Sequence, residues 1–201
     1  MASTCTADAA PRAVVTLSLG NRPFVQHTRP LMAAYAERIG ADFHCVASRE
    51  HVALRTVAAV TGDAASTSRF FKVPLLAHFL QRYARVLYLD DDVLVGPAMP
   101  DLFARVPCAA LGATVEEHKP QAWHSMHFRN ACELYGVAPC DARRWKLFNS
   151  GVMLLSREAH GAMLRRGWRV DGPRLKCRVL CDQVPHPTHT SAWLAGTLVL
   201  F

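Results

Sequence analysis

Apolar and polar positions alternate along the first part of the chain in a way that predicts a strand, a helix and a second strand. Residues 13–19 form an apolar run that predicts a buried strand, and turn residues follow it. Residues 30–39 have apolar positions at helical spacing, with Pro30 suited to the first turn and Gly40 to the stop. The apolar positions of this helix are Leu31, Ala34, Tyr35 and Ile39. Residues 42–47 predict the next strand, so the segment indicates a parallel β-α-β unit.

The same patterns continue along the chain and predict one α/β domain. Residues 68–83 have apolar positions three and four apart, with Ser68 as the N-cap of a helix. The other predicted elements are strands over 86–89, 109–115 and 148–155, a short helical segment at 101–103, and a helix over 156–167 capped by Ser156. Between them, residues 116–146 show little periodicity. We therefore predict a single domain, residues 1–201, with a mostly parallel sheet flanked by helices.

Three carboxylates follow the most apolar of the predicted strands. Residues 86–89, VLYL, lead directly into Asp90, Asp91 and Asp92. In open α/β sheets, ligands bind outside the carboxyl ends of the strands. Side chains alternate in an extended chain, so Asp90 and Asp92 are expected on one side, where two hard oxygen ligands suit Mg²⁺ or Mn²⁺. A solvated acidic turn is the alternative interpretation.

Composition and charge narrow the class of protein. The chain has 201 residues, 51% hydrophobic and 19% charged, which fits one globular domain. No apolar run reaches the roughly 18 residues of a transmembrane helix. Residues 1–12 lack the apolar core of a signal peptide, so the chain as it stands is expected in the cytoplasm, or in the Golgi or ER lumen if an N-terminal signal-anchor is missing. The net charge of +7 favours anionic ligands, but no nucleic-acid-binding module is present, so no nucleic acid is expected as a partner.

The cysteines do not predict a metal centre. There are seven, and none forms a C-x-x-C pair, so zinc is poorly supported. Cys45 and Cys108 lie in apolar segments and are expected to be small buried hydrophobes. In a lumenal protein the pairs Cys132–Cys140 or Cys177–Cys181 would be candidates for disulfides, a question that the sequence leaves open.

Three segments together resemble nucleotide-sugar glycosyltransferases of the GT-A (Rossmann-like) fold, and within them glycosyltransferase family eight, the group of glycogenin and the bacterial galactosyltransferases. They are the Thr16-Leu17-Ser18 strand end, the helix and strand that lead to Asp90-x-Asp92, and the element Phe148-Asn149-Ser150-Gly151-Val152. An Asp-Gln pair further on matches Asp182-Gln183. The resemblance covers about residues 13–183. It implies a retaining hexosyltransferase that moves a sugar from a nucleotide-sugar donor, UDP-linked by analogy, to an unknown glycan, protein or lipid acceptor.

The resemblance also implies roles for individual residues. Asp90 and Asp92 would hold Mn²⁺ or Mg²⁺ on the donor diphosphate, and the metal would neutralise charge on the leaving nucleoside diphosphate. The other residues with implied roles are Arg69 and Lys72 for the nucleotide or its phosphates, Thr16, Leu17 and Ser18 for uracil and ribose, Ser150 and Gly151 for the pocket floor, and Asn149, Asp182 and Gln183 for the donor sugar and acceptor. Asp91 would either point away from the site or contact the ribose or sugar. Purely structural interpretations, such as a solvated helix face for Lys72 or a β-bulge at Gly151, remain open.

Two departures from the family pattern support alternative functions. Family-eight enzymes usually carry a late His-x-x-Gly-x-x-Lys segment, whereas residues 184–201 offer His186 and His189 without that pattern and end in an atypical apolar tail. The GT-A domain is therefore expected to miss part of its C-terminal region. The first alternative is a non-catalytic or truncated glycosyltransferase-like protein that binds nucleotide or glycan. A haloacid-dehalogenase-type phosphotransferase is a weaker alternative, because Leu94 stands where that class has Thr or Val.

Overall fold

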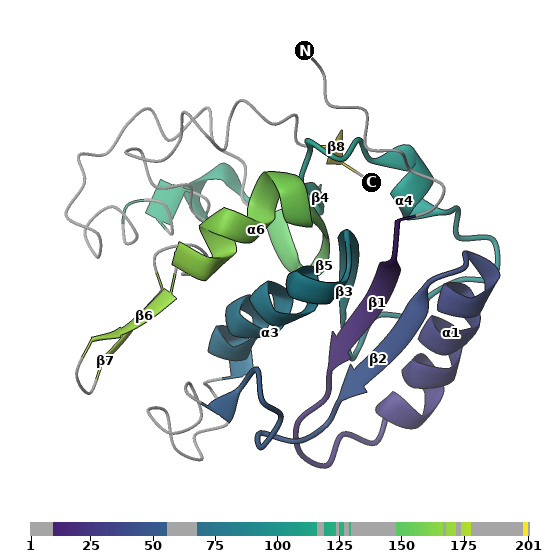
Figure 1. Ribbon diagram of the computed structural model, residues 1–201, viewed down its shortest axis with the longest axis horizontal. Helices are drawn as coiled ribbons and strands as arrows, with labels where there is room; N and C mark the ends of the chain where they lie inside the picture. Colours follow the sequence, from purple (N-terminus) through teal and green to yellow (C-terminus); the bar gives the residue numbers. More distant parts are fainter. Residues whose placement is uncertain are drawn as a thin grey trace.

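The protein is an α/β domain built on a six-stranded mixed sheet (Figure 1). The computed structural model describes residues 10–55, 68–115, 119–123, 125–126, 129, 148–166, 168–171, 174–177 and 199–200. The strands of the sheet are β1 (Arg12–Leu17), β2 (Asp42–Val46), β3 (Arg85–Asp90), β4 (Gly112–Val115), β5 (Phe148–Ser156) and β8 (Val199–Leu200), in the order β2-β1-β3-β5-β4-β8. The helices are α1 (Val25–Arg38), α3 (Ser68–Arg82), α4 (Leu102–Arg105) and α6 (Arg157–Arg166), and β6 (Trp168–Asp171) pairs with β7 (Arg174–Cys177) in a separate hairpin.

The strand directions bring several chain segments to one edge of the sheet. β1 pairs in parallel with both β2 and β3, so the carboxyl ends of these three strands lie together. β5 runs antiparallel to β3, and its first residues therefore lie beside the carboxyl end of β3. The predicted α/β class is confirmed, and the predicted parallel β-α-β unit is β1-α1-β2. The apolar end of the chain also joins the sheet, because β8 pairs in parallel with β4.

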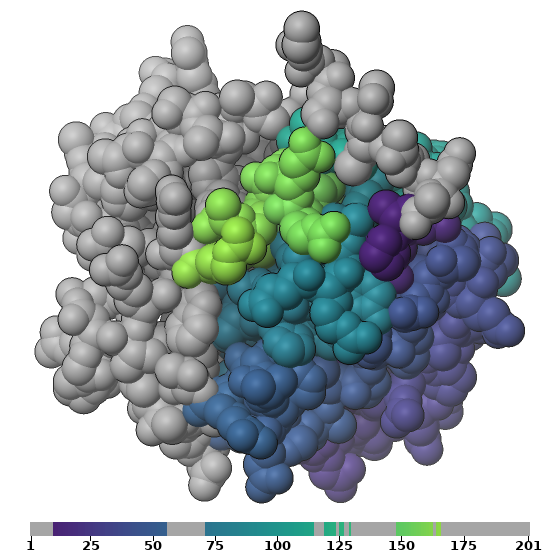
Figure 2. All heavy atoms as spheres, viewed as in Figure 1, coloured from purple at the N-terminus to yellow at the C-terminus, as the bar shows by residue number. Residues whose placement is uncertain are grey.

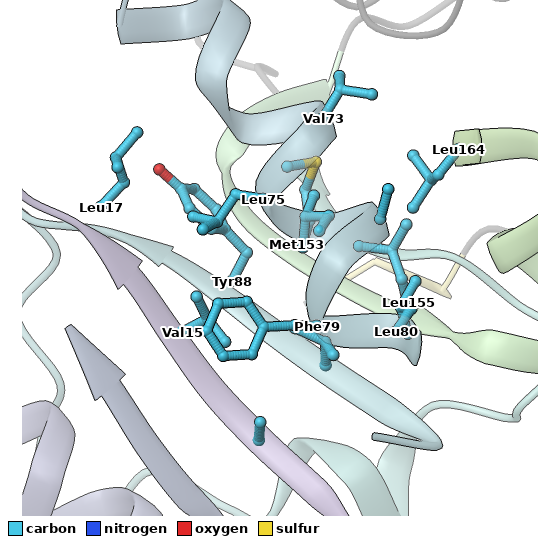
Figure 3. Packing of buried hydrophobic residues seen from close by; sticks show 14 of the residues in the cluster. Val15, Leu17, Val73, Leu75, Phe79, Leu80, Tyr88, Met153, Leu155 and Leu164 are labelled. Carbon is cyan, nitrogen blue, oxygen red and sulfur yellow. The ribbon is translucent and has the colours of Figure 1, made fainter. Parts of the chain in front are cut away.

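Each face of the sheet carries its own hydrophobic core, as the alternation of β3 shows. Val86 and Tyr88 belong to the cluster on the face covered by α3 and α6, whereas Leu87 and Leu89 belong to the cluster on the face covered by α1 and α4. Figure 3 shows the first cluster, where side chains of α3 and α6 pack on the sheet. In the space-filling view α3 and α6 lie side by side on this face (Figure 2). With both faces covered, β3 is apolar until it reaches the edge.

Helix α1 differs from its prediction in its start and in its buried face. It begins at Val25, so Pro30 lies inside the helix and not in its first turn. Leu31 is 41% exposed, whereas Met32 is fully buried. The buried positions are Thr28, Met32, Tyr35, Ala36 and Ile39. The apolar positions alone predict the wrong face because a polar residue, Thr28, belongs to the buried face. Its hydroxyl donates a 2.6 Å hydrogen bond to the Asp91 carbonyl.

Several other local predictions can be compared with the structure. Gly40 has a φ of +64°, so the left-handed stop after α1 is confirmed. Ser156 is the last residue of β5, and its hydroxyl makes no hydrogen bond within the described part of the chain, so the predicted cap is wrong. The backbone N–H of Ser156 is instead bonded to Nδ1 of His160 at 3.0 Å. Cys45 and Cys108 are free thiols of intermediate exposure and are not fully buried as predicted.

Among the described residues, no helix is long and apolar enough to cross a membrane.

Candidate functional site

The candidate site begins where β3 ends. Asp90 is the last residue of the strand, and the Val93 N–H donates a 3.0 Å hydrogen bond to its carbonyl, which closes a tight turn. The three consecutive carboxylates therefore have different surroundings: the Asp90 side chain is 31% exposed, that of Asp91 is 5% exposed, and Asp92 lies on the surface. Since the extended chain ends at Asp90, strand alternation does not set the direction of Asp92. The turn sets it instead.

Asp90 is held by a lysine and a tyrosine from the α3 side of the sheet. Lys72 Nζ of α3 lies 2.8 Å from Asp90 Oδ1 and 2.9 Å from Oδ2, and the lysine side chain is only 12% exposed. The Tyr88 hydroxyl donates to Asp90 Oδ1 at 2.7 Å. Burial raises the pKa of Tyr88 well above its usual value, and the nearby Asp90 charge raises it further, so the phenol stays protonated and remains a donor. Asp90 is thus an acceptor held in place by two donors, Lys72 and Tyr88, at the sheet edge.

A bulge in β5 completes this side of the site. In the pairing of β4 with β5 the register jumps from Ala113–Met153 to Thr114–Asn149, so residues 150–152 have no partner on β4. Ser150 lies in this bulge, and both its carbonyl and its hydroxyl oxygen contact Lys72 Nζ, at 3.3 and 3.2 Å. The first, polar residues of the predicted strand therefore contain a bulge, and two oxygens of Ser150 in this bulge contact the lysine that is bound to Asp90.

Glycine is required at position 151 by the close approach of two side chains. An added Cβ would lie 2.7 Å from Asn149 Oδ1 and 2.9 Å from Asp90 Oδ2, and Asn149 Oδ1 also accepts the Gly151 N–H at 2.6 Å. Contacts below 3.0 Å force a neighbour to move, and here one neighbour is the carboxylate already bound to Lys72. Gly151 is therefore the residue that lets β5 and the Asp90 carboxylate lie together.

We expect Gly151→Ala to displace Asp90 and to lower stability by about 1–3 kcal/mol through overpacking. Gly96→Ala is the matched control, because a Cβ at Gly96 would meet no atom within 4 Å. Urea denaturation followed by circular dichroism measures the difference between the two variants. Equal midpoints for Gly151→Ala and Gly96→Ala would contradict the close approach described above.

Asp91 lies on the other face of the sheet, toward the loop that leads into α1. Arg22 Nε is 3.3 Å from Asp91 Oδ2, an ion pair whose N–H is not aimed at the oxygen, so Oδ2 has no hydrogen bond within the described part of the chain. Burial raises the pKa of Asp91, while the charge of Arg22 and a hydrogen bond with Ser18 lower it. Asp91 therefore contacts both the loop before α1, through Arg22, and the start of α1, through Thr28, and holds them at the end of β3.

Of the remaining predicted site residues, two are buried in β1 and three lie outside the described part of the structure or have side chains outside it. Thr16 is 1% exposed and its hydroxyl has no hydrogen bond within the described residues, and Leu17 is 7% exposed and packs in the core on the α3 side. Leu17 is opposite Asp90 in the register, so both residues lie at the same edge. Arg69 lies in α3, but its side chain is outside the described part, as are Asp182 and Gln183. The roles of these five residues stay predictions.

Sequence reasoning missed three residues that shape the site: Tyr88, Arg22 and Thr28. Tyr88 was recognised only as an apolar strand residue, although its spacing of two from Asp90 puts both side chains on one face. Arg22 and Thr28 gave no signal, because their contacts with Asp91 span 69 and 63 positions of the chain, and such pairings appear only once the fold is known.

The described residues contain no group of three or more His, Cys, Asp or Glu side chains that together could hold a metal ion. At the carboxyl end of β3, solvent can reach the carboxylates of Asp90, which is partly exposed, and Asp92, which is exposed.

Comparison with known proteins found similar solved structures. No protein-family model matches the chain, and no curated protein matches it. One similar solved structure is described as the "crystal structure of a glycosyltransferase involved in the glycosylation of the major capsid of PBCV-1". It shares 14% identity with this chain at a TM-score of 0.48, and the match covers 77% of this chain and 64% of that chain.

Proposed function

We propose that this chain transfers a sugar, as a retaining hexosyltransferase, from a UDP-linked nucleotide-sugar donor to a glycan, protein or lipid acceptor. The observation that carries the proposal is the meeting of Asp90, Lys72 and Ser150 at the carboxyl ends of parallel strands. This is the edge at which α/β sheets bind their ligands. An ammonium and a half-exposed carboxylate side by side suit a donor whose phosphates are anionic and whose sugar offers hydroxyls.

The donor set fits Mn²⁺ or Mg²⁺ bound together with a diphosphate. Asp90 and Asp92 are hard oxygen ligands that solvent can reach. Magnesium-type ions are usually held by one or two carboxylates and complete their shell with water and substrate phosphates, so a third protein ligand is not required. Bound there, the ion would neutralise charge on the departing nucleoside diphosphate.

The chain's own residues would bind and orient the donor around that chemistry. In this proposal Lys72 supplies a fixed positive charge beside the phosphates, and Tyr88 holds the Asp90 carboxylate in one orientation through its hydrogen bond. The Ser150–Gly151 bulge forms the floor for the sugar, since only a residue without a side chain leaves room beside Asp90. Asn149, Asp182 and Gln183 are proposed to contact the sugar and acceptor, and Thr16, Leu17 and Asp91 the nucleoside, in line with the resemblance to family eight.

A thermal-shift titration with UDP, with and without Mn²⁺, tests the donor site. A ligand that binds only the folded protein raises its melting temperature, by about 5–10 °C at a hundredfold excess over the Kd for a chain of this size. We expect this rise in the wild type when UDP and Mn²⁺ are both present, and its loss in Asp90→Ala/Asp92→Ala. A folded wild type that shows no rise would refute the donor site.

A second assay separates an enzyme from a binding protein. Release of UDP from a panel of UDP-sugars, measured with Mn²⁺ present, detects slow donor hydrolysis without knowledge of the acceptor. Stabilisation by UDP and Mn²⁺ without UDP release or sugar transfer would favour the alternative of a non-catalytic glycosyltransferase-like protein.

A further inference from the structure

We propose that Lys72 makes cation binding and donor binding depend on each other, because its ammonium group occupies the oxygens of Asp90 that a divalent cation would need. The inference rests on the proposed function and adds a form of regulation to the same site. In the absence of donor, Lys72 opposes the cation. When the donor diphosphate is present, the same positive charge favours the complex.

The geometry gives Lys72 both oxygens of the carboxylate. Nζ donates a hydrogen bond to Asp90 Oδ2 at 2.9 Å and lies 2.8 Å from Oδ1 in the ion pair, and the Tyr88 hydroxyl donates to Oδ1 at 2.7 Å. A carboxylate oxygen accepts about two hydrogen bonds. Both oxygens of Asp90 therefore already have a partner, and a cation can bind Asp90 only by sharing these oxygens with the ammonium group or by displacing it.

A second set of contacts would keep the ammonium group near the site when it moves away from Asp90. Nζ already contacts the carbonyl and the hydroxyl of Ser150, and it lies 5.3 Å from the centre of the Tyr88 ring. These neutral contacts do not depend on Asp90. The ammonium group of Lys72 can thus move away from the Asp90 carboxylate and still keep contacts with the protein.

The charges near Asp90 give the direction of the effect. Lys72 places its ammonium group against both oxygens of Asp90, so a free cation meets a weaker negative field there than the carboxylate alone would give. Asp91 adds little, since it lies on the opposite face with Arg22. A diphosphate adds negative charge beside the lysine, and the repulsion between Lys72 and the cation is then offset. Like charges a few ångströms apart at a partly buried site alter binding equilibria by about tenfold or more.

Calorimetric titration of Mn²⁺ into wild type and into Lys72→Met tests the inference. Methionine keeps an unbranched chain and removes the charge. We expect Lys72→Met to bind Mn²⁺ alone about tenfold more tightly than wild type, and the enhancement of Mn²⁺ affinity by saturating UDP to shrink by about the same factor. Lys72→Arg should keep the wild-type coupling, and Lys119→Met, at a lysine over the Trp123 ring, should change neither affinity.

The possible outcomes separate this inference from the proposed function. An unchanged or weaker affinity of Lys72→Met for Mn²⁺ alone, in a folded protein whose wild type binds Mn²⁺ with UDP, would overturn the inference and leave the donor site intact. A wild type that binds neither Mn²⁺ nor UDP, even together, would refute the proposed function itself. Circular dichroism of each variant establishes that it is folded.

Discussion

Replacing Asp90 with asparagine is expected to reduce UDP release from a UDP-sugar by at least about 100-fold, the usual cost of removing one group that stabilises transition-state charge. The amide has the size of the carboxylate but no charge, and it offers only one oxygen to the two donors, Lys72 and Tyr88, that now share two. In the proposed donor site the cation would lose a ligand, and Lys72 would lose the partner that positions it. Initial rates at saturating donor and Mn²⁺ measure the effect.

Glu37→Gln is the matched control for this substitution, because it makes the same carboxylate-to-amide change on the exposed side of α1. We expect it to keep wild-type activity. If Asp90→Asn retained more than about a tenth of the wild-type rate while folding normally, Asp90 would have no part in the chemistry, and the site would have to be sought elsewhere.

Acid is expected to destabilise the protein through His160, by about 1.5 kcal/mol between pH 6.5 and pH 5. Burial lowers the pKa of His160 from 6.5 to about 4, and the charge of Arg85 lowers it too, whereas the Ser156 carbonyl opposes the shift. Below pH 6.5 the unfolded chain takes up a proton at this ring, but the folded chain does not until about pH 4. The unfolded state therefore binds more protons in that window, and stability falls as the pH falls.

Urea denaturation at pH 6.5 and pH 5 measures this loss, and the difference between wild type and His160→Gln isolates the contribution of one ring. The variant is needed because burial also lowers the pKa of His44, His51 and His78, which act in the same direction. His27→Gln, at an exposed histidine, serves as the control. An identical pH dependence in His160→Gln and wild type would contradict the prediction.

The elements of this fold were predictable where one signal dominated. The run VLYL before Asp90 predicted β3 within one residue, and the periodicity after Ser68 predicted α3. The face of α1 was not predictable from apolar residues alone. Thr28 is buried because its hydroxyl donates a hydrogen bond to the Asp91 carbonyl. This contact exists only once α1 is packed beside the end of β3, so the sequence alone gives no sign of it.

The candidate site was predictable in its residue types but not in its contacts. The strand pattern singled out Asp90, the resemblance to family eight singled out Lys72 and Ser150, and the structure brings the three within hydrogen-bonding distance. Alternation along the strand predicted that Asp91 points away from Asp90, and Asp91 does lie on the other face beside Arg22. The direction of Asp92 could not be predicted in the same way. Strand alternation was applied to Asp92, but β3 ends at Asp90, and a turn follows no two-residue period.

The bulge at Ser150 has a consequence for how the domain holds together. β5 starts beside Lys72 of α3 and runs from this edge of the sheet to the opposite edge. There it continues directly into α6, which packs on α3. β5 continues into α6, α6 packs on α3, and the contact between Lys72 and Ser150 joins α3 back to the start of β5. The α3–α6 packing and the surroundings of Asp90 are therefore connected in two ways, through α3 itself and through the continuous β5–α6 segment.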